Sequence, residues 1–235
     1  LNYTDGVTSN IQTQLDSKVG ASYTGDVDIT GELLVDSYNE TFKKVSSVSA
    51  TTGFLLSSAS YDSKSFSVVS QETGAEAVVL SYDGTKMYIV GTSSDTVFQY
   101  TLSTAFDVST ASYDSKSFSV ASQDATPRGV QFKSDGTKMY VVGSTGNVFQ
   151  YSLSTAWDVS TASYDSVSLS VASQETAPNA IVFSSNGTKL YMVGPTNDTV
   201  YQYDLSTAWD LSTGSYASKS LSVSSQETTP VGIAI

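Results

Sequence analysis

Three related copies of one unit fill the chain from residue 59 onward. The segment SYDGTKMYIVG at 81–91 returns as SDGTKMYVVG at 134–143 and as SNGTKLYMVG at 185–194. The equivalent positions Ala59, Ala111, Ala162 and Gly214 are separated by 52, 51 and 52 residues. A period of this length is typical of a β-propeller blade or a solenoid coil, and neither can bury its apolar face alone. The repeat therefore predicts an array of stacked units.

Each copy predicts four short strands, which in the first copy span 77–81, 86–91, 96–102 and 116–120. The pairs Asp83-Gly84, Asp135-Gly136 and Asn186-Gly187 stand between the first two strands and signal tight hairpins. The run MYIV does not alternate between apolar and polar residues, so we expect both faces of that strand to be covered. The pattern favours an all-β fold with β-propeller-type repeats of four-stranded antiparallel blades. A trimeric β-solenoid is the rival fold.

The phase of the repeat predicts an incomplete ring. Three whole repeats are preceded by an orphan outer strand, Ser63–Val68, and followed by an orphan inner strand, Val231–Ile235. Propellers typically close with about four to eight blades, so three cannot form a ring. Either residues are missing or other chains complete the ring, and we favour missing residues. The first residue is not methionine, so we expect a piece of a longer or processed protein.

The chain before the array divides into two further predicted segments. Residues 1–20 predict a short helical stalk or coil, because Val7, Ile11 and Leu15 recur at a spacing of four. A frayed linker is the alternative, since so short a helix is marginal in water. Residues 21–58 predict a β stalk and connector, with Val27 and Ile29 on one face of a strand. The propeller repeat array then occupies residues 59–235.

Composition excludes several classes of function. The net charge is −12, with 23 acidic against 11 basic residues, and a field of this sign repels nucleic acid. The chain has no cysteine and no histidine, so thiolate and imidazole metal ligands are lacking. No apolar run approaches the roughly 20 residues needed for a membrane-spanning helix. We therefore expect no nucleic-acid partner, no membrane insertion and no cofactor, with calcium left open because it needs only oxygen ligands.

The acidic residues that recur in register have structural and functional interpretations. Asp83 and Asp135 resemble candidate carboxylates, but Asn186 replaces them in the third copy, which favours turn chemistry. A sialidase would need several arginines to bind its substrate's carboxylate, and Arg128 is the only arginine here. Asp107, in the STA(F/W)D segment, and its equivalents favour a tight corner between strands. The same structural interpretation applies to the acidic residues of the SQ(E/D) loops, Glu72, Asp124, Glu175 and Glu227. We predict no catalytic and no metal-ligating residue.

Candidate binding residues lie where the copies differ. Residues identical in all copies are best explained as scaffold, whereas the second hairpin of each blade varies at 92–95, 144–147 and 195–198. Loops on a rigid scaffold often carry function. The aromatic residues of the corners offer a second hypothesis, as platforms for the faces of sugars. Together these patterns predict binding residues Ser93, Ser94, Asp95, Thr145, Asn147, Asn197, Asp198, Trp157 and Trp209.

The repeat also resembles known families. Its core, SxDGTKMYVVG followed by VxQYxL, resembles the YVTN-type β-propeller repeats of surface and secreted proteins. The longer form with STAWDVSTASY resembles repeats in tail-fibre and other virion structural proteins of bacteriophages, marine ones in particular. The leading segments DGVTSNIQTQLDSK and GDVDITGELLVDS resemble stalk modules of such fibres.

This resemblance implies a non-enzymatic tail-fibre protein with a structural and host-adhesion role. It implies glycan or receptor binding, assembly as a homotrimer with other virion proteins, and an extracellular location in the virion. A secreted or surface bacterial propeller that acts as an interaction scaffold is the first alternative. A polysaccharide depolymerase that uses paired carboxylates is the second.

Overall fold

The structure, a computed structural model, describes residues 59–235. Residues Ser60–Ile235 form one compact unit. The segments predicted as a helical stalk, 1–20, and a β stalk, 21–58, lie outside the described residues. Within residues 59–235 the regular structure consists of β-strands and three short 3-10 helices.

The strands form three antiparallel sheets of four strands each, in chain order within each sheet. The first blade contains β1 (Ala75–Leu80), β2 (Lys86–Gly91), β3 (Thr96–Leu102) and β4 (Ala111–Ser119). The second contains β5 (Pro127–Phe132), β6 (Lys138–Gly143), β7 (Asn147–Leu153) and β8 (Ala162–Ser170). The third contains β9 (Ala180–Phe183), β10 (Lys189–Val193), β11 (Thr199–Leu205) and β12 (Gly214–Ser222). The predicted all-β fold of propeller-type blades is confirmed.

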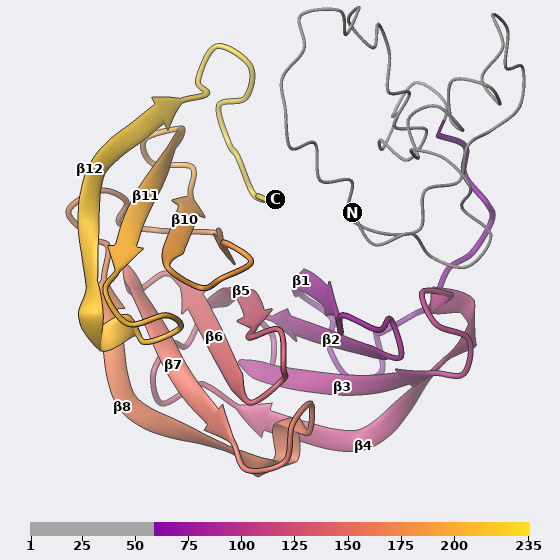
Figure 1. Ribbon diagram of the computed structural model, residues 1–235. Helices are drawn as coiled ribbons and strands as arrows, with labels where there is room; N and C mark the ends of the chain where they lie inside the picture. Colours follow the sequence, from indigo (N-terminus) through magenta and orange to yellow (C-terminus); the bar gives the residue numbers. More distant parts are fainter. Residues whose placement is uncertain (1–58) are drawn as a thin grey trace, which may run out of the picture. The chain divides into compact units, whose positions relative to one another are not determined.

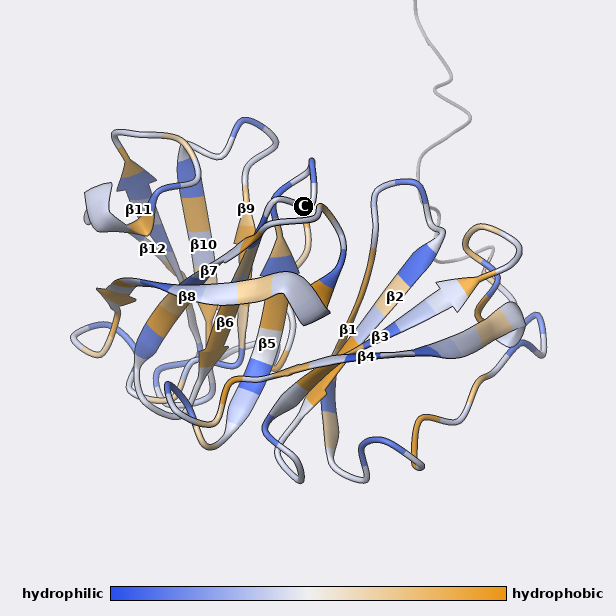
Figure 2. Ribbon diagram, turned by 90° about the horizontal axis from the view of Figure 1, so that it is seen from below, coloured by the Kyte–Doolittle hydropathy of each residue, from blue (hydrophilic) through white to orange (hydrophobic). Residues whose placement is uncertain are grey.

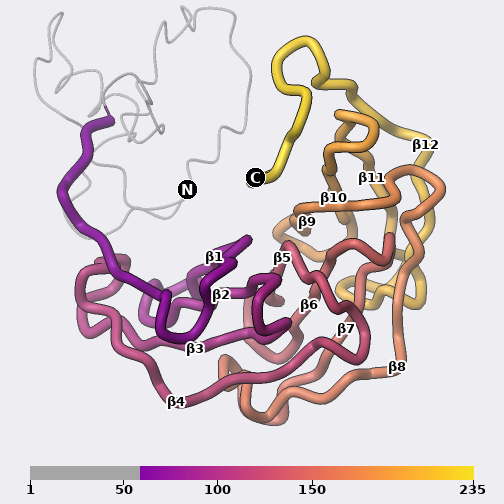
Figure 3. Tube along the Cα trace, turned by 180° about the vertical axis from the view of Figure 1, so that it is seen from behind, coloured from indigo at the N-terminus to yellow at the C-terminus, as the bar shows by residue number. Residues whose placement is uncertain are grey.

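The blades lie side by side with their first strands innermost (Figures 1 and 3). β1, β5 and β9 lie on the inner side, and β4, β8 and β12 form the outer rim. Hydrophobic residues are prominent on β6, the second strand of its blade, and on β9, an inner strand (Figure 2). This arrangement brings equivalent positions of the three inner strands toward one side of the unit.

The predicted hairpins form at the Asp-Gly and Asn-Gly pairs. In the first blade the Asp83 carboxylate accepts hydrogen bonds from the Ser81 hydroxyl at 2.6 Å and the Thr85 main-chain N–H at 3.0 Å. Gly84 has a φ of 69°, a left-handed conformation that costs glycine no steric strain. The Asn186 amide oxygen accepts the equivalent two bonds in the third blade, at 2.8 and 3.2 Å. The turn interpretation of these side chains therefore fits their contacts.

The outer strands are longer than the sequence predicts. The prediction placed the fourth strand of the first copy at 116–120, whereas β4 spans Ala111–Ser119. A β-bulge interrupts the pairing of β3 with β4, and Ser115 within it has a φ of 57°. The bulge directs Asp114 to accept hydrogen bonds from the amide of Gln99 at 2.9 Å and the ammonium of Lys86 at 3.2 Å. Alternation of apolar residues cannot reveal a strand across such an interruption.

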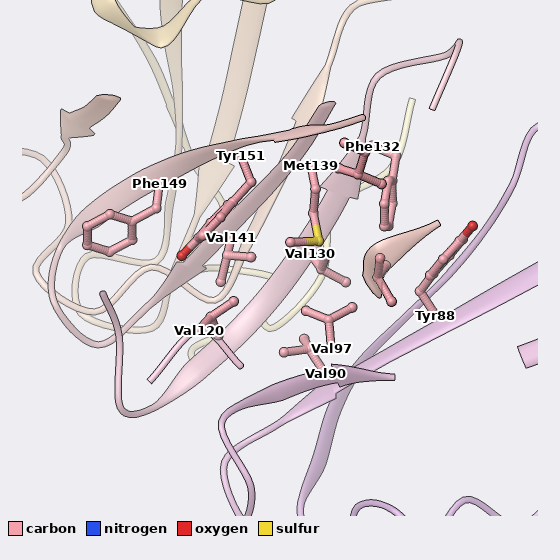
Figure 4. Close-up of a cluster of buried hydrophobic side chains, with 12 residues drawn as sticks. Tyr88, Val90, Val97, Val120, Val130, Phe132, Met139, Val141, Phe149 and Tyr151 are labelled. Atoms are coloured by element: carbon pink, nitrogen blue, oxygen red, sulfur yellow. The ribbon is translucent and has the colours of Figure 1, made fainter. Parts of the chain in front are cut away.

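The main cores lie between blades (Figure 4). Val90 and Val97 of the first blade meet Val130, Met139 and Val141 of the second in one buried cluster. These five side chains of the first cluster are each at most 3% exposed. An equivalent cluster joins the second and third blades. Each blade thus depends on its neighbours to remove its apolar faces from water.

Hydrogen bonds repeat at both blade interfaces. The Tyr88 hydroxyl donates to the carbonyl of Trp157 at 2.7 Å, and the Gln99 side-chain oxygen accepts from the N–H of Val159 at 3.0 Å. At the next interface, Tyr140 donates to the carbonyl of Trp209 at 2.6 Å, and Gln150 accepts from the N–H of Leu211 at 2.9 Å. In both cases the carbonyl and the N–H that the following blade contributes lie in the corner that precedes its outer strand. The three corners contain the 3-10 helices η2 (Val108–Thr110), η3 (Val159–Thr161) and η4 (Leu211–Thr213).

Two flanking segments, Ser60–Val69 and Pro230–Ile235, pack on the outermost blades of the array without forming strands. Phe66 meets the ring of Tyr100 edge-on with 5.6 Å between centroids, and Lys64 pairs with Asp107 at 2.8 Å. β4 makes the equivalent contacts with the second blade: Phe118 meets the ring of Tyr151 at 5.5 Å, and Lys116 pairs with Asp158 at 2.6 Å. The strands predicted at 63–68 and 231–235 therefore do not form. Lys64 and Phe66 make the side-chain contacts of an outer strand, but a strand also requires a hydrogen-bonded neighbour, and the described residues give these segments none.

Candidate functional site

One position on the inner edge of the blades differs in every copy. In each blade, one residue of the first strand pairs with the valine that precedes the glycine after MYIV, MYVV or LYMV. These equivalent pairs are Ala77 with Val90, Gly129 with Val142 and Ala180 with Val193. The position just before the first-strand residue is Glu76 in the first blade, Arg128 in the second and Asn179 in the third, and the C-terminal segment has Val231 there. The neighbouring positions of these inner segments also vary between copies, but apart from Gln131 they stay small or apolar, whereas this position is acidic, basic, amide or apolar.

These four residues line the same cavity, which has a volume of about 310 Å³. The inner strands β1, β5 and β9 and the C-terminal segment form its walls. The polar residues that line it include Glu76, Arg128 and Gln131. We call it the axial cavity. Its volume is at the lower end of the roughly 300–1,000 Å³ that small-molecule sites occupy.

Arg128 is positioned by the following blade. Its Nη1 donates to the side-chain oxygen of Asn179 at 3.0 Å and to the carbonyl of Ala177 at 3.5 Å. The Asn179 amide nitrogen in turn lies 3.5 Å from the carbonyl of Pro230. Among residues 59–235 no carboxylate forms an ion pair with Arg128. The remaining guanidinium nitrogens can therefore bind an acceptor brought by a ligand.

The residues of the axial cavity are not among the predicted binding residues. The sequence does contain a signal for three of them, because the aligned inner segments AEAVVL, PRGVQF and PNAIVF have an acidic, a basic and an amide residue at their second position. The hairpin turns vary over several consecutive residues and therefore give a stronger sequence signal than this single column.

The predicted loop residues lie in three separate turns, one to a blade. Ser93, Ser94 and Asp95 connect β2 to β3, Thr145 lies in the β6–β7 turn with Asn147 at the start of β7, and Asn197 and Asp198 lie in the β10–β11 turn. None of these residues lines the axial cavity. The structure therefore does not bring them together with Arg128.

A buried acidic residue holds each of these turns. The Glu72 side chain, 2% exposed, accepts hydrogen bonds from the N–H of Gly74 at 2.7 Å, the N–H of Ser93 at 3.1 Å and the hydroxyl of Ser94 at 2.6 Å. Burial raises the pKa of Glu72, but these hydrogen bonds outweigh it and hold the pKa below the usual value. Asp124 and Glu175 bind the turns of the other two blades in the same way. These contacts fit the structural interpretation of the SQ(E/D) loops.

The two tryptophans predicted as platforms pack at the corners between blades. The Trp157 ring lies 5.6 Å from the ring of Phe132 and 6.3 Å from that of Tyr88. The Trp209 ring lies 5.0 Å from that of Phe183. Trp209 also lines a second cavity, of about 470 Å³, with the exposed Tyr82. The tryptophans and the variable turns thus belong to different surfaces.

Over residues 59–235, no three acidic, histidine or cysteine side chains gather as a metal site. The expectation of no cofactor, with calcium left open, stays a prediction. No helix in the same range has the length and apolarity required to cross a membrane.

Comparisons with known proteins relate the chain to solved β-propellers through its fold. No protein family matches the sequence, and no curated protein is significantly similar to it. A Bacteroides fragilis protein assigned as a 6-phosphogluconolactonase is 12% identical with a TM-score of 0.48, covering 63% of this chain and 39% of that one. The periplasmic gluconolactonase of Pseudomonas aeruginosa is 17% identical with a TM-score of 0.46, covering 63% and 41%. A functionally unknown protein of Desulfotomaculum acetoxidans is 19% identical with a TM-score of 0.47, covering 63% and 42%.

The matched part of the chain thus spans about two fifths of the length of these solved proteins. At these identities the likeness concerns the fold alone. The chain's resemblance to phage fibres, its location in a virion and its assembly as a homotrimer are not tested by these comparisons and stay predictions.

The comparisons contradict the predicted function. Three of the similar structures are named for lactonases, which are enzymes, and none of five such structures is named as a fibre or virion protein. The prediction of a non-enzymatic tail-fibre protein with a receptor-binding role is therefore wrong. Its physical weakness is clear from the contacts above. The repeated residues form turns, corners and cores, and these specify a propeller without specifying what the propeller binds.

Proposed function

We propose that the propeller unit binds a small hydroxy acid in the axial cavity. The observation that carries this proposal is the convergence of Glu76, Arg128 and Asn179 on one cavity from equivalent positions of three related blades. A scaffold role alone would favour the same residue in each copy. Different charges at one register position instead provide a site with distinct recognition groups on its walls.

The charges indicate the class of ligand. Arg128 has guanidinium nitrogens available for a carboxylate, and a guanidinium pairs with a carboxylate through two parallel hydrogen bonds. Glu76 and Gln131 line the same cavity, and side chains of these types can accept hydrogen bonds from hydroxyl groups. A net charge of −12 repels an anion at long range, so Arg128 supplies the local attraction. A ligand with one carboxylate and several hydroxyls satisfies both kinds of group.

Isothermal titration calorimetry on the full chain tests this proposal. The probes are gluconate, its uncharged lactone and the uncharged polyol sorbitol. We expect gluconate to bind most tightly and R128Q to weaken its binding by roughly tenfold or more, since charge-assisted hydrogen bonds contribute about 1.5–3 kcal/mol. R128K keeps the charge but loses the paired geometry, so its affinity should be intermediate.

K133Q is the matched control, because it removes a positive charge at a surface ion pair with Asp135. It should leave gluconate binding unchanged. Equal loss in K133Q and R128Q would show a nonspecific effect of charge. Gluconate binding that is undetectable in the wild-type protein, or unaffected by R128Q, would refute the proposal.

A further inference from the structure

Asn186 is the only asparagine of the chain that precedes glycine, and the pair lies at the turn between β9 and β10. We call residues 184–188 the Asn186 turn. Asparagine is a thermolabile residue, and it reacts most readily before glycine, because glycine has no side chain to hinder attack by its main-chain nitrogen. Asn186 is exposed, whereas Gly187 is buried. The turn therefore contains a group that can change its chemistry without an enzyme.

The change is deamidation, and it needs only water. The main-chain nitrogen of Gly187 bonds to Cγ of Asn186, and the bond between Cγ and the side-chain nitrogen breaks. The proton displaced from Gly187 leaves with that nitrogen as ammonia, and a cyclic succinimide remains. Water then opens the ring at either of its carbonyls, which forms a carboxyl group and returns a proton to the Gly187 nitrogen. Opening at Cγ yields aspartate, whereas opening at the main-chain carbonyl yields isoaspartate.

The folded turn opposes the first step. The Gly187 N–H donates to the carbonyl of Ser184 at 2.8 Å, so the nitrogen that must attack is engaged. The Asn186 side-chain oxygen accepts from the main-chain N–H of Thr188 at 3.2 Å and from its hydroxyl at 2.8 Å. The Gly187 carbonyl accepts from the N–H of Trp209 at 3.0 Å. Ring closure requires the Gly187 nitrogen and Cγ to approach each other, so these bonds must open first.

The turns of the first two blades indicate which product the fold accepts. Asp83 stands at the position of Asn186, and its carboxylate accepts from the main-chain N–H of Thr85 at 3.0 Å and from its hydroxyl at 2.9 Å. Asp135 accepts the same two bonds from Thr137, at 3.0 and 2.6 Å. An aspartate at position 186 can therefore keep the hydrogen bonds of the asparagine, and its charge strengthens them.

Isoaspartate does not fit the folded turn. It inserts an extra carbon into the main chain directly before Gly187. A Cβ atom placed on Gly187 would already collide with the indole of Trp209, so the site has no room for a displaced backbone. Both main-chain groups of Gly187 are hydrogen-bonded, and a longer chain would have to break at least one of these bonds. The two products should therefore differ in stability.

We propose that Asn186 is a site of spontaneous deamidation that reacts when its turn opens, and that the folded turn accepts the aspartate product. The hydrogen bonds of the turn set how often the reactive geometry is reached, because local opening must precede ring closure. Deamidation to aspartate gives the third blade the residue that the first two blades already have. It also adds one negative charge to the exposed side of the turn.

Peptide mapping by mass spectrometry after incubation at mildly alkaline pH tests the proposal. The full chain is compared with a synthetic peptide of residues 181–191, which has the same Asn-Gly pair without the fold. We expect Asn186 to deamidate in both, but about tenfold or more slowly in the full chain, because its turn must open first. A full chain that reacts as fast as the peptide would overturn the proposal.

Two matched variants test whether this turn controls the rate. T188A removes a hydroxyl that holds the Asn186 side chain, and it should accelerate deamidation severalfold in the full chain but not in the peptide. T137A removes the equivalent hydroxyl from the second blade and should leave the rate at Asn186 unchanged. Equal acceleration by both variants would overturn control by this turn. Intact Asn186 in the wild-type protein and T188A, after complete reaction of the peptide, would overturn the site itself.

Urea unfolding tests whether the fold accepts the product. N186D supplies aspartate directly, and S185D adds the same charge at the exposed residue before it. We expect N186D to be at least as stable as the wild-type protein, because Ser184 and Thr188 can donate to its carboxylate. A midpoint for N186D below those of both the wild-type protein and S185D would overturn the acceptance of aspartate.

Discussion

The hydroxyl of Tyr140 donates a 2.6 Å hydrogen bond to the main-chain carbonyl of Trp209, a residue of the following blade. Tyr88 makes the same bond to Trp157 one blade earlier. Burial raises the pKa of Tyr140, so its hydroxyl keeps its proton and remains a donor well above neutral pH. One side chain thus fixes the position of the next blade's corner at each interface.

Replacing this donor tests how much the bond contributes to the array. We expect Y140F to lower the free energy of unfolding by about 1 kcal/mol, and by up to about 3 if the carbonyl is left buried without a partner. Y191F is the matched control, because Tyr191 has the same sequence context but no such partner in residues 59–235. Chemical denaturation would measure both. Equal losses in the two variants would contradict this role of the Tyr140 hydroxyl.

Glycine is required where a corner aromatic covers a hairpin turn. Gly136 has a φ of 72°, and a Cβ atom at this position would collide with the indole of Trp157. We expect G136A to destabilise the protein by about 2 kcal/mol or more, since the left-handed backbone alone costs an ordinary residue about 1–2 kcal/mol. G232A should be neutral, because no atom lies within 4 Å of its Cβ position. Thermal unfolding of the two variants would decide, and a harmless G136A would show that the ring can move aside.

The turn between the second and third strands contains a natural comparison. Asp95 and Asp198 have φ values of 51° and 47°, and each has a buried carboxylate oxygen without a hydrogen-bond partner. The second blade has Gly146, with a φ of 67°, at the equivalent place. We expect D95G and D198G each to stabilise the protein by about 1 kcal/mol, because both the strain and the unpaired oxygen disappear.

The reverse substitution should have the opposite effect. A Cβ atom on Gly146 would lie 2.9 Å from that of Ala172, so G146D should destabilise the protein. Denaturant midpoints measured for all three variants would test the comparison. A loss of stability in D95G and D198G would mean that these carboxylates make a favourable interaction in solution.

Acid should weaken the fold through carboxylates such as Glu72. Its folded pKa lies below the ordinary 4.5, because hydrogen bonds to the charged form outweigh the effect of burial. The unfolded chain therefore binds the proton at a higher pH than the folded chain. The stability that Glu72 contributes is complete above pH 4.5 and is lost as the pH falls through the folded pKa.

The variant E72Q isolates this contribution. It should lower stability at neutral pH by about 1–3 kcal/mol, the cost of leaving the buried N–H groups of the turn poorly paired. It should also lose less stability than the wild-type protein between neutral and acidic pH. Urea unfolding curves recorded across this pH range would show it, and identical pH dependence in the two proteins would contradict the linkage.

Much of the fold could be predicted because its signals are local. β2 and β3 have the predicted bounds, since Asp83-Gly84 fixes one hairpin and the unbroken run MYIV marks a strand covered on both faces. β4 was predicted too short, because the bulge at Ser115 interrupts the alternation on which the prediction depended. The strands predicted in the two flanks, 63–68 and 231–235, do not form, because a strand requires a hydrogen-bonded neighbour and the described residues give the flanks none.

The candidate site was harder to predict, since it depends on which strand is innermost. Arg128 and Glu76 are 52 residues apart in the sequence, and they face one cavity only because β1 and β5 both lie on the inner side of the array. The variable turns drew attention because they differ in several consecutive residues. A single differing position in an apolar strand gives a weaker sequence signal, although its chemical contrast is greater.

The equivalence of the two blade interfaces has a consequence for how the gene can change. Since Tyr88 and Tyr140 meet the same atoms of the following unit, a duplicated or deleted copy of about 52 residues would leave every junction with compatible partners. Unequal recombination between copies can thus lengthen or shorten the protein in whole steps without requiring any compensating mutation.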